Sequence, residues 1–529
     1  MPVEVVAGVD KMEGGFNPHT LADLSPTSAA LSSLMLPSVF RPDPQGRPQL
    51  DTTLMQSADV VPGADKFTVR YQIRKEAGWS DGGTIAAEDF VYLWQQMRSQ
   101  PGVAGAAGYQ LIDDVKSRQG GKTVEVTFAK PFPGWRSLFN NLLPAHLLKD
   151  DPHSWSSALD GGYPASGGPF AIRQVDRTRG EIVLERNDRY WGRPAASDRI
   201  VLRSSDQEKQ VSALRSGDSH LAVFNANART MDALRGLGDK VRLTTIPRPA
   251  TMQVLLRPNT QALAEQKVRK AVIAGLDREA LTDVGTAGGP ADQLRAHSQV
   301  LAPSEPGYTP TEPPGAVSQR PDPQRLAQLL TEAGYERSGG TWVRNGRPLN
   351  LVIGAPFEHK QYVKIAQEAA KQLQDQGIQA TAVTPTGDQL FGQMLAANPL
   401  AEDPTNSSVD MAIAPRPAGG DPAAMLDSSY GCPRSSNEQS FPTNDAGFCD
   451  ELLQPTIEAA MTGHIPFRQA SARVESQLWQ RGIAVPLYQQ AQIMAARPEV
   501  PGLQPGNGLS GPFSTAAEWV GTPSQDDGY

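Results

Sequence analysis

The pentapeptide Gly78-Trp79-Ser80-Asp81-Gly82 matches G-x-S-x-G, the pattern that places a nucleophilic serine on a strand-to-helix turn in serine hydrolases. Such an elbow needs its helix to begin directly after the serine, so that the helix terminus and the adjacent amide support an oxyanion. Here a glycine-rich stretch intervenes, and the helix is capped near Thr84 to Glu88. None of the seven histidines has a recognisable catalytic context. The pentapeptide therefore predicts a turn rather than a nucleophile.

Two phosphate-binding patterns are matched only in part. Residues 506–511 fit G-x-G-x-x-G, but they lie near the C-terminus with no βαβ unit to open. Gly121-Lys122-Thr123 ends like a P-loop, yet Lys116 stands where the first glycine belongs. Metal spacing such as H-E-x-x-H is absent. The sequence therefore predicts no cofactor, no metal site and no catalytic residues.

The two cysteines, Cys432 and Cys449, flank a polar, turn-rich segment without histidine or a third cysteine, so a zinc site is not expected. They are either two separate buried thiols or partners in a disulfide. We favour the disulfide, because the segment has little apolar surface to bury and needs another constraint. A disulfide implies an oxidising compartment.

Length and charge narrow the class of protein. A chain of 529 residues is expected to form two or three domains. Acidic residues outnumber basic ones by 57 to 49, so no basic excess exists to neutralise nucleic acid or an anionic membrane. No apolar run is long enough to span a bilayer. The first residues carry no signal-peptide pattern, which fits a trimmed extracytoplasmic protein or a cytoplasmic one.

Helical and strand patterns alternate along the chain. Polarity alternates strictly over 67–73, as in a half-buried strand, and the next helix places Phe90, Leu93, Trp94 and Met97 on one face. Further helices are expected at 25–35, 206–217, 265–281, 322–335 and 362–377, and further strands at 4–10, 110–117, 122–130, 180–187, 199–204 and 378–383. This alternation, with Pro-rich joints, favours α/β lobes over a barrel or a bundle.

An ordered series of phrases carries more information than any single motif. The series runs over "EGGFNPHT", "FTVRYQIRKEAGWSDGG", "PASGGPFAI", "ERNDRYWGRP", "VRKAVIAGLDREAL" and "IAVPLYQQAQI". It resembles, almost end to end, the family 5 extracytoplasmic solute-binding proteins, the peptide- and nickel-binding receptors of ABC importers. Gly78 to Gly82 resemble that family's W-S-D-G turn.

The resemblance implies a bilobal α/β fold of the type II periplasmic-binding-protein kind, with an extra small domain in the first lobe. Lobe I would comprise 1–30, 160–248 and 484–529, the small inserted domain 31–159, and lobe II 249–483. The chain would cross between lobes near Arg248 and near Ile483. A ligand would sit in the cleft between the lobes, with hinge closure around it. In the small domain, Phe132, Trp135 and Phe139 either form an apolar rim or fill the interior.

One departure from the family pattern concerns the ligand. Peptide-binding members usually carry Trp-x-x-Asp ahead of a Pro-containing turn, and the acid pairs with the peptide's ammonium group. Aligned on Asp421-Pro422, this chain has Pro415 at the tryptophan and Ala418 at the acid. A buried ammonium without a carboxylate is strongly disfavoured. Either Asp421 takes the role from a shifted position, or the ligand carries no ammonium; we favour the second.

The resemblance also gives the candidate ligand contacts. Sugar hydroxyls are recognised by planar polar side chains and aromatic faces. The candidates are Phe16, Asn17, Ser166, Gly168, Phe170, Arg416, Ala418 and Asp421. Each has a purely structural alternative: the glycine and asparagine shape turns, the phenylalanines pack in the core, and the arginine is a solvated loop charge.

Within the family, the chain most resembles mycobacterial lipoproteins linked to control of phosphatidylinositol mannoside and lipoarabinomannan assembly. The resemblance implies a non-enzymatic, monomeric regulator, anchored outside the membrane by a lipid. It would bind a mannosylated phosphatidylinositol intermediate, or a partner enzyme such as a membrane mannosyltransferase. Three alternatives stay open: an ABC-importer receptor for peptides or another solute, a hydrolase built on Ser80, and a scaffold with an empty cleft.

Overall fold

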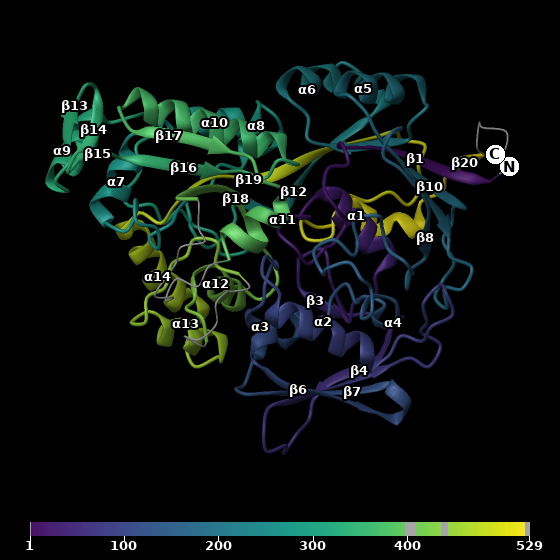
Figure 1. Ribbon diagram of the computed structural model, residues 1–529. Coiled ribbons are helices and arrows are strands. Elements are labelled where there is room, and N and C mark those ends of the chain that lie inside the picture. Colours follow the sequence, from purple (N-terminus) through teal and green to yellow (C-terminus); the bar gives the residue numbers. More distant parts are fainter. Residues whose placement is uncertain (1, 397–408, 435–442, 524–529) are drawn as a thin grey trace. The chain divides into compact units, whose positions relative to one another are not determined.

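The computed structural model describes residues 2–396, 409–434 and 443–523 (Figure 1). The chain divides into two compact units: unit 1 comprises Met1–Arg98, Gly108–Arg248 and Ala491–Tyr529, and unit 2 comprises Ser99–Ala107 and Pro249–Gln490. Two long strands belong to both units. They are β12 (Arg242–Leu256), which enters unit 2 after Arg248, and β19 (Ala484–Ala496), which returns to unit 1 after Gln490.

The sheet of unit 1 is built around its first strand, β1 (Val3–Val9). β1 pairs in parallel with β10 (Arg199–Ser204) and β11 (Leu221–Phe224), and its side chains from Val5 to Val9 are buried. Such a continuous apolar run is typical of a strand covered on both faces. The antiparallel strands β9 (Glu181–Arg186), β8 (Phe170–Asp176) and β20 (Thr522–Pro523), and the end of β19, complete the sheet.

Helices pack on this sheet through apolar faces. Helix α1 (Pro26–Met35) begins where the Ser25 hydroxyl accepts the Ser28 amide at 3.1 Å, as an N-cap should. Helices α5 (Gln207–Ser216) and α6 (Ala228–Arg235) lie side by side in Figure 1, and their apolar side chains share a buried cluster with those of β11 and β19. Helix α5 ends at Gly217, which adopts the left-handed conformation common at helix C-termini.

A second, smaller sheet lies within unit 1. Its strand order is β4 (Met55–Val60), β5 (Thr68–Ile73), β7 (Thr123–Phe128) and β6 (Ile112–Arg118), all antiparallel. Helix α2 (Ala87–Ser99) packs on it, with Tyr71 against Phe90 at 5.5 Å between ring centroids. Phe132, Trp135 and Phe139 are buried, so they fill this region rather than form an apolar rim.

The strands of unit 2 belong to the same hydrogen-bonded sheet, in the order β17 (Gln379–Val383), β16 (Asn350–Gly354), β18 (Met411–Pro417), β12 and β19. Helix α10 (Lys360–Asp375) packs along β16 and β17, and α8 (Arg278–Thr286) packs beside α10 (Figure 1). The remaining main helices of the unit are α7 (Gln266–Ala274), α9 (Pro323–Glu332), α12 (Pro422–Tyr430), α13 (Gln454–Met461) and α14 (Phe467–Arg481).

Short elements connect these layers. They are β2 (Phe40–Pro42), β3 (Pro48–Leu50), α3 (Ala107–Gln110), α4 (Ala145–Leu148), β13 (Glu336–Ser338), β14 (Thr341–Arg344), β15 (Arg347–Pro348) and α11 (Gly387–Gln389). Across the described ranges, no helix combines the length and the apolar character that crossing a membrane requires.

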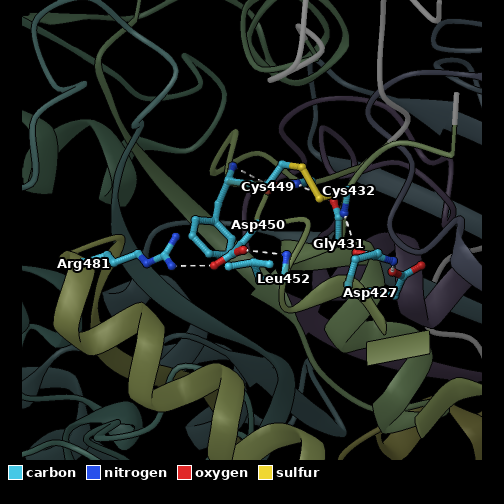
Figure 2. Close-up of a disulfide and its surroundings, with 10 residues drawn as sticks. Asp427, Gly431, Cys432, Cys449, Asp450, Leu452 and Arg481 are labelled. Carbon is cyan, nitrogen blue, oxygen red and sulfur yellow. Dashed lines mark hydrogen bonds and ion pairs between the residues drawn. A yellow bond between two sulfur atoms is a disulfide. The ribbon is translucent and has the colours of Figure 1, made fainter. Parts of the chain in front are cut away.

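A disulfide joins Cys432 and Cys449 in unit 2 (Figure 2). It connects the chain just after α12 to the segment that leads into α13. The Cys432 amide donates to Gln454 Oε1 at 2.8 Å, which fixes the same junction from the α13 side. Figure 2 shows Arg481 of α14 directed at Asp450, which follows the second cysteine. The disulfide thus lies among contacts that hold α12, α13 and α14 together.

Candidate functional site

The loop after β1 carries the candidates Phe16 and Asn17, and it is rigidly held. The Asp23 carboxylate accepts the amides of Gly15 at 2.9 Å and Asn17 at 3.1 Å. The Arg177 guanidinium lies over the Phe16 ring at 4.9 Å from its centroid. Phe16 is 1% exposed and Asn17 is fully buried. Both side chains therefore shape the loop from inside.

The candidates Ser166, Gly168 and Phe170 come together in one buried turn before β8. Ser166 Oγ donates to the Phe170 carbonyl and accepts the Gly168 amide at 3.1 Å. The Ser166 amide in turn donates to Ser80 Oγ at 2.9 Å, and the Ser80 amide donates to the Ser166 carbonyl at 2.8 Å. The hydroxyl of the G-x-S-x-G pentapeptide thus joins two turns, as expected for a structural landmark.

Gly168 is a position where a side chain has no room. A Cβ there would lie 2.1 Å from the Leu34 carbonyl oxygen, which belongs to the backbone of α1. We expect Gly168→Ala to lower the free energy of unfolding by roughly 1–3 kcal/mol, because the turn or the helix must shift. Urea unfolding measures the change. Gly161→Ala is the matched control, since its Cβ would meet no atom within 4 Å; equal stability of the two variants would contradict the packing account.

The unit 2 candidates follow one another along β18 and the loop after it. Arg416 is 4% exposed. It donates to the Val300 carbonyl and to the hydroxyl of Thr251, its partner residue on the neighbouring strand β12. The Ala418 amide donates to the Pro249 carbonyl at 2.8 Å. Asp421 is the N-cap of α12, where it accepts the Ala424 amide at 2.9 Å, and burial raises the pKa of its carboxyl. All three positions have structural duties.

One acidic residue beside this loop was not predicted. Glu305 accepts the Gly419 amide at 3.0 Å through Oε1 and the Ala302 amide at 2.6 Å through Oε2. It therefore places a carboxylate one residue from Ala418, although it lies more than a hundred residues away in the sequence. No sequence signal identifies it, because the contact depends on how the 296–305 segment crosses unit 2.

Unit 1 also contains a cavity that the sequence did not predict. Its empty volume is about 320 Å³, part of it solvent at the mouth, and its enclosed part has room for about one water molecule. Polar side chains from α1, β12, β19, the residue after β1 and the C-terminal segment line it: Asp10, Thr27, Arg248, Gln492 and Ser510. The C-terminal segment includes Gly511, the last residue of the G-x-G-x-x-G match.

In the described part of the chain, no group of three or more His, Cys, Asp or Glu side chains is arranged to hold a metal ion. The polar groups of the cavity are instead suited to hydrogen bonding. They combine a carboxylate, a guanidinium, an amide and two hydroxyls, which supply donors and acceptors in nearly equal measure.

Similarity to known proteins places the chain in context. It is 36% identical to the "Probable monoacyl phosphatidylinositol tetramannoside-binding protein LpqW" of Mycobacterium tuberculosis H37Rv, over 98% of this chain and 92% of that protein. It is 26% identical to the oligopeptide-binding protein OppA of Mycobacterium bovis, over 89% and 77% of the two chains.

The fold matches that of solved binding proteins. The structure of the oligopeptide-binding protein AppA of Bacillus subtilis, in complex with a nonapeptide, superposes with a TM-score of 0.75 at 17% identity, covering 99% of this chain and 100% of that one. This likeness confirms the predicted α/β fold of periplasmic binding proteins. The family model for bacterial extracellular solute-binding proteins, family 5 Middle, matches residues 56–437. The chain therefore belongs to family 5 of the bacterial extracellular solute-binding proteins.

Proposed function

We propose that this chain is a non-enzymatic, extracytoplasmic lipoprotein that binds a mannosylated phosphatidylinositol and thereby regulates phosphatidylinositol mannoside and lipoarabinomannan synthesis. The observation that carries the proposal is the 36% identity, over 98% of the chain, to a protein whose name specifies a monoacyl phosphatidylinositol tetramannoside as ligand. Similarity over almost the entire length supports the proposal more strongly than one shared motif would.

The loop after β18 supports a ligand without an ammonium group. Aligned on Asp421-Pro422, Ala418 falls at the position where we expect peptide-binding members of the family to carry their acid. Asp421, the next acid along the chain, is already engaged as the N-cap of α12. A ligand rich in hydroxyl groups needs no buried charge partner, since neutral hydrogen bonds suffice.

Ser80 supports the absence of catalysis. Its hydroxyl accepts the Ser166 amide and links two structural turns. In the proposed role, regulation comes from the liganded protein acting on a membrane mannosyltransferase, and chemistry belongs to that partner.

The proposal is tested by thermal unfolding in the presence of a ligand panel. We expect phosphatidylinositol mannosides, presented in mixed micelles, to raise the unfolding temperature in a concentration-dependent manner, because a ligand that binds only the folded state stabilises it. Free oligopeptides and micelles of unmannosylated phosphatidylinositol are the controls. Stabilisation by peptides, with none by mannosides, would refute the proposal.

A second candidate function is a peptide receptor for an ABC importer, and Glu305 is the observation that favours it. Its carboxylate lies beside Gly419, close to the position of the missing acid. If a peptide's amino end is bound there, Glu305→Gln should abolish stabilisation by peptides. Under our proposal, Glu305→Gln leaves stabilisation by mannosides as it is in the unchanged protein.

A further inference from the structure

The cavity of unit 1 brings together polar groups from five separate segments. Asp10 follows β1, Thr27 lies in the first turn of α1, and Gln492 lies on β19. Gln492 Nε2 donates to Asp10 Oδ2 at 2.8 Å, and the Asn225 amide donates to Asp10 Oδ1 at 2.9 Å. The carboxylate is thus fixed in orientation by two donors while it still lines the cavity.

Arg248 supplies the opposite charge. It is 6% exposed and lines the same cavity. Burial lowers the pKa of its guanidinium to about 10, so the group stays protonated at neutral pH. The guanidinium carries five N–H donors. Its Nη1 atom lies against Gly511, where a Cβ would be only 2.4 Å from that nitrogen. Gly511 has a φ of 68°, so a glycine there provides both the backbone conformation and the space for the guanidinium.

The G-x-G-x-x-G segment forms the wall beside Arg248. Asn507 Oδ1 accepts the amides of Leu509 at 2.8 Å and Ser510 at 2.9 Å, which folds the segment into a tight turn. The turn brings Ser510 and Gly511 to the cavity. The motif therefore shapes this cavity and does not surround a dinucleotide.

The lining discriminates between ligand classes by charge. An anionic group would meet the Asp10 carboxylate, a cationic group would meet the Arg248 guanidinium, and an apolar group would desolvate these polar side chains without hydrogen-bonding to them. A hydroxyl group avoids all three costs, because it donates to a carboxylate and accepts from a guanidinium at once. The enclosed volume, about that of a water molecule, also fits a single hydroxyl group.

We propose that this cavity is a subsite for a hydroxyl-bearing edge of the polyol part of the ligand, an inositol or mannose ring. The inference rests on the proposed function and specifies where the protein contacts the ligand's ring. One ring hydroxyl enters the cavity, donates to Asp10 and accepts from Arg248, while Thr27 and Ser510 hydrogen-bond the neighbouring hydroxyl.

Calorimetric titration with glycerophosphoinositol tetramannoside, the water-soluble deacylated headgroup, tests the subsite. Thr27→Val, which keeps the side chain's shape, should weaken binding about fivefold, the effect of one neutral hydrogen bond. Asp10→Asn should weaken it about tenfold or more, the effect of a charged acceptor. The matched controls are Thr245→Val and Asp59→Asn, exposed residues of unit 1, which should bind within about twofold of the unchanged protein.

The outcomes separate the subsite from the function. If the unchanged protein binds the headgroup and Thr27→Val and Asp10→Asn bind equally well, the subsite is refuted and the function stands. If the unchanged protein binds no headgroup, both are refuted. Asp10→Asn also changes the group that accepts the Asn225 amide, so this variant could fail to fold. In that case the Thr27→Val result alone decides the test. Repeating the titration with glycerophosphoinositol, which has no mannose, identifies the ring in the subsite. If Thr27→Val still weakens binding, the subsite holds the inositol ring; if it no longer does, the subsite holds a mannose ring.

Discussion

Replacing Cys432 and Cys449 together with serine is expected to lower the free energy of unfolding of unit 2 by about 3 kcal/mol. The two cysteines are 17 residues apart, and cross-linking such a segment removes conformational freedom from the unfolded chain. The segment supplies few apolar side chains of its own. Asp450, next to the second cysteine, pairs with Arg481, and Gln454 accepts the Cys432 amide. Both contacts can still form in the variant. Without the disulfide, however, no covalent bond keeps the interacting residues close together.

Hydrogen exchange during urea unfolding locates the effect. Peptides from α12 and α13 should exchange at lower urea concentrations in the double variant, while the small sheet of unit 1 keeps its protection. Reduction of the unchanged protein with a thiol should reproduce the change, and the same thiol should leave the double variant as it is. Equal protection of α12 in both proteins would show that the disulfide adds no stability.

Lowering the pH from 6.5 to 4 is expected to remove about 3 kcal/mol of stability through His19 alone. Burial lowers the pKa of His19 from 6.5 to about 4. The ring donates to the Asn141 carbonyl at 2.8 Å and stacks on Trp155 at 6.0 Å between centroids. Between pH 6.5 and 4, His19 binds a proton in the unfolded chain but stays neutral in the folded protein. The stability is therefore fully present above pH 6.5 and is lost as the pH falls towards 4.

Urea unfolding at several pH values, compared between variants, isolates this term. His19→Gln keeps a donor for the Asn141 carbonyl but cannot be protonated, so its stability should fall less steeply between pH 6.5 and 4. His153→Gln, at an exposed position, should follow the unchanged protein. An identical slope for His19→Gln and the unchanged protein would mean that His19 is protonated in the folded state.

Local patterns predicted much of the fold, because they depend on near neighbours. The alternation over 67–73 became β5, and α2 buries Phe90, Leu93 and Met97 as its periodicity indicated. Trp94 is only half-buried, with the Arg98 guanidinium over its ring at 5.0 Å. Ser25 and Gly217 mark the start of α1 and the end of α5, since capping is a property of a few adjacent residues.

The candidate site was harder to predict, because its members depend on contacts between distant segments. The resemblance pointed to Phe16 and Phe170, but their burial shows that both pack inside unit 1. Whether any of the predicted candidates contacts a ligand stays a prediction. Asp10 and Arg248 look unremarkable in the sequence, and only the pairing of β1, β11, β19 and β12 brings their segments together.

Glu305, the acid beside Gly419, was also not predictable from the sequence. Aligned on Asp421-Pro422, the chain has Ala418 at the expected position of the acid, and this favours a ligand without an amine. The fold adds Glu305 to the same loop from a distant segment. Its two oxygens accept two backbone amides, so Glu305 holds this loop in place, and the Glu305→Gln variant tests whether it also binds an amine.

A competition followed by native mass spectrometry tests most directly what this protein binds. The purified chain is incubated with equal amounts of monoacyl phosphatidylinositol tetramannoside and a mixture of nonapeptides. Our account predicts one dominant adduct with the mass of the glycolipid, and no peptide adduct. Peptide adducts alone, with the glycolipid left unbound, would contradict it and would assign the chain to peptide uptake.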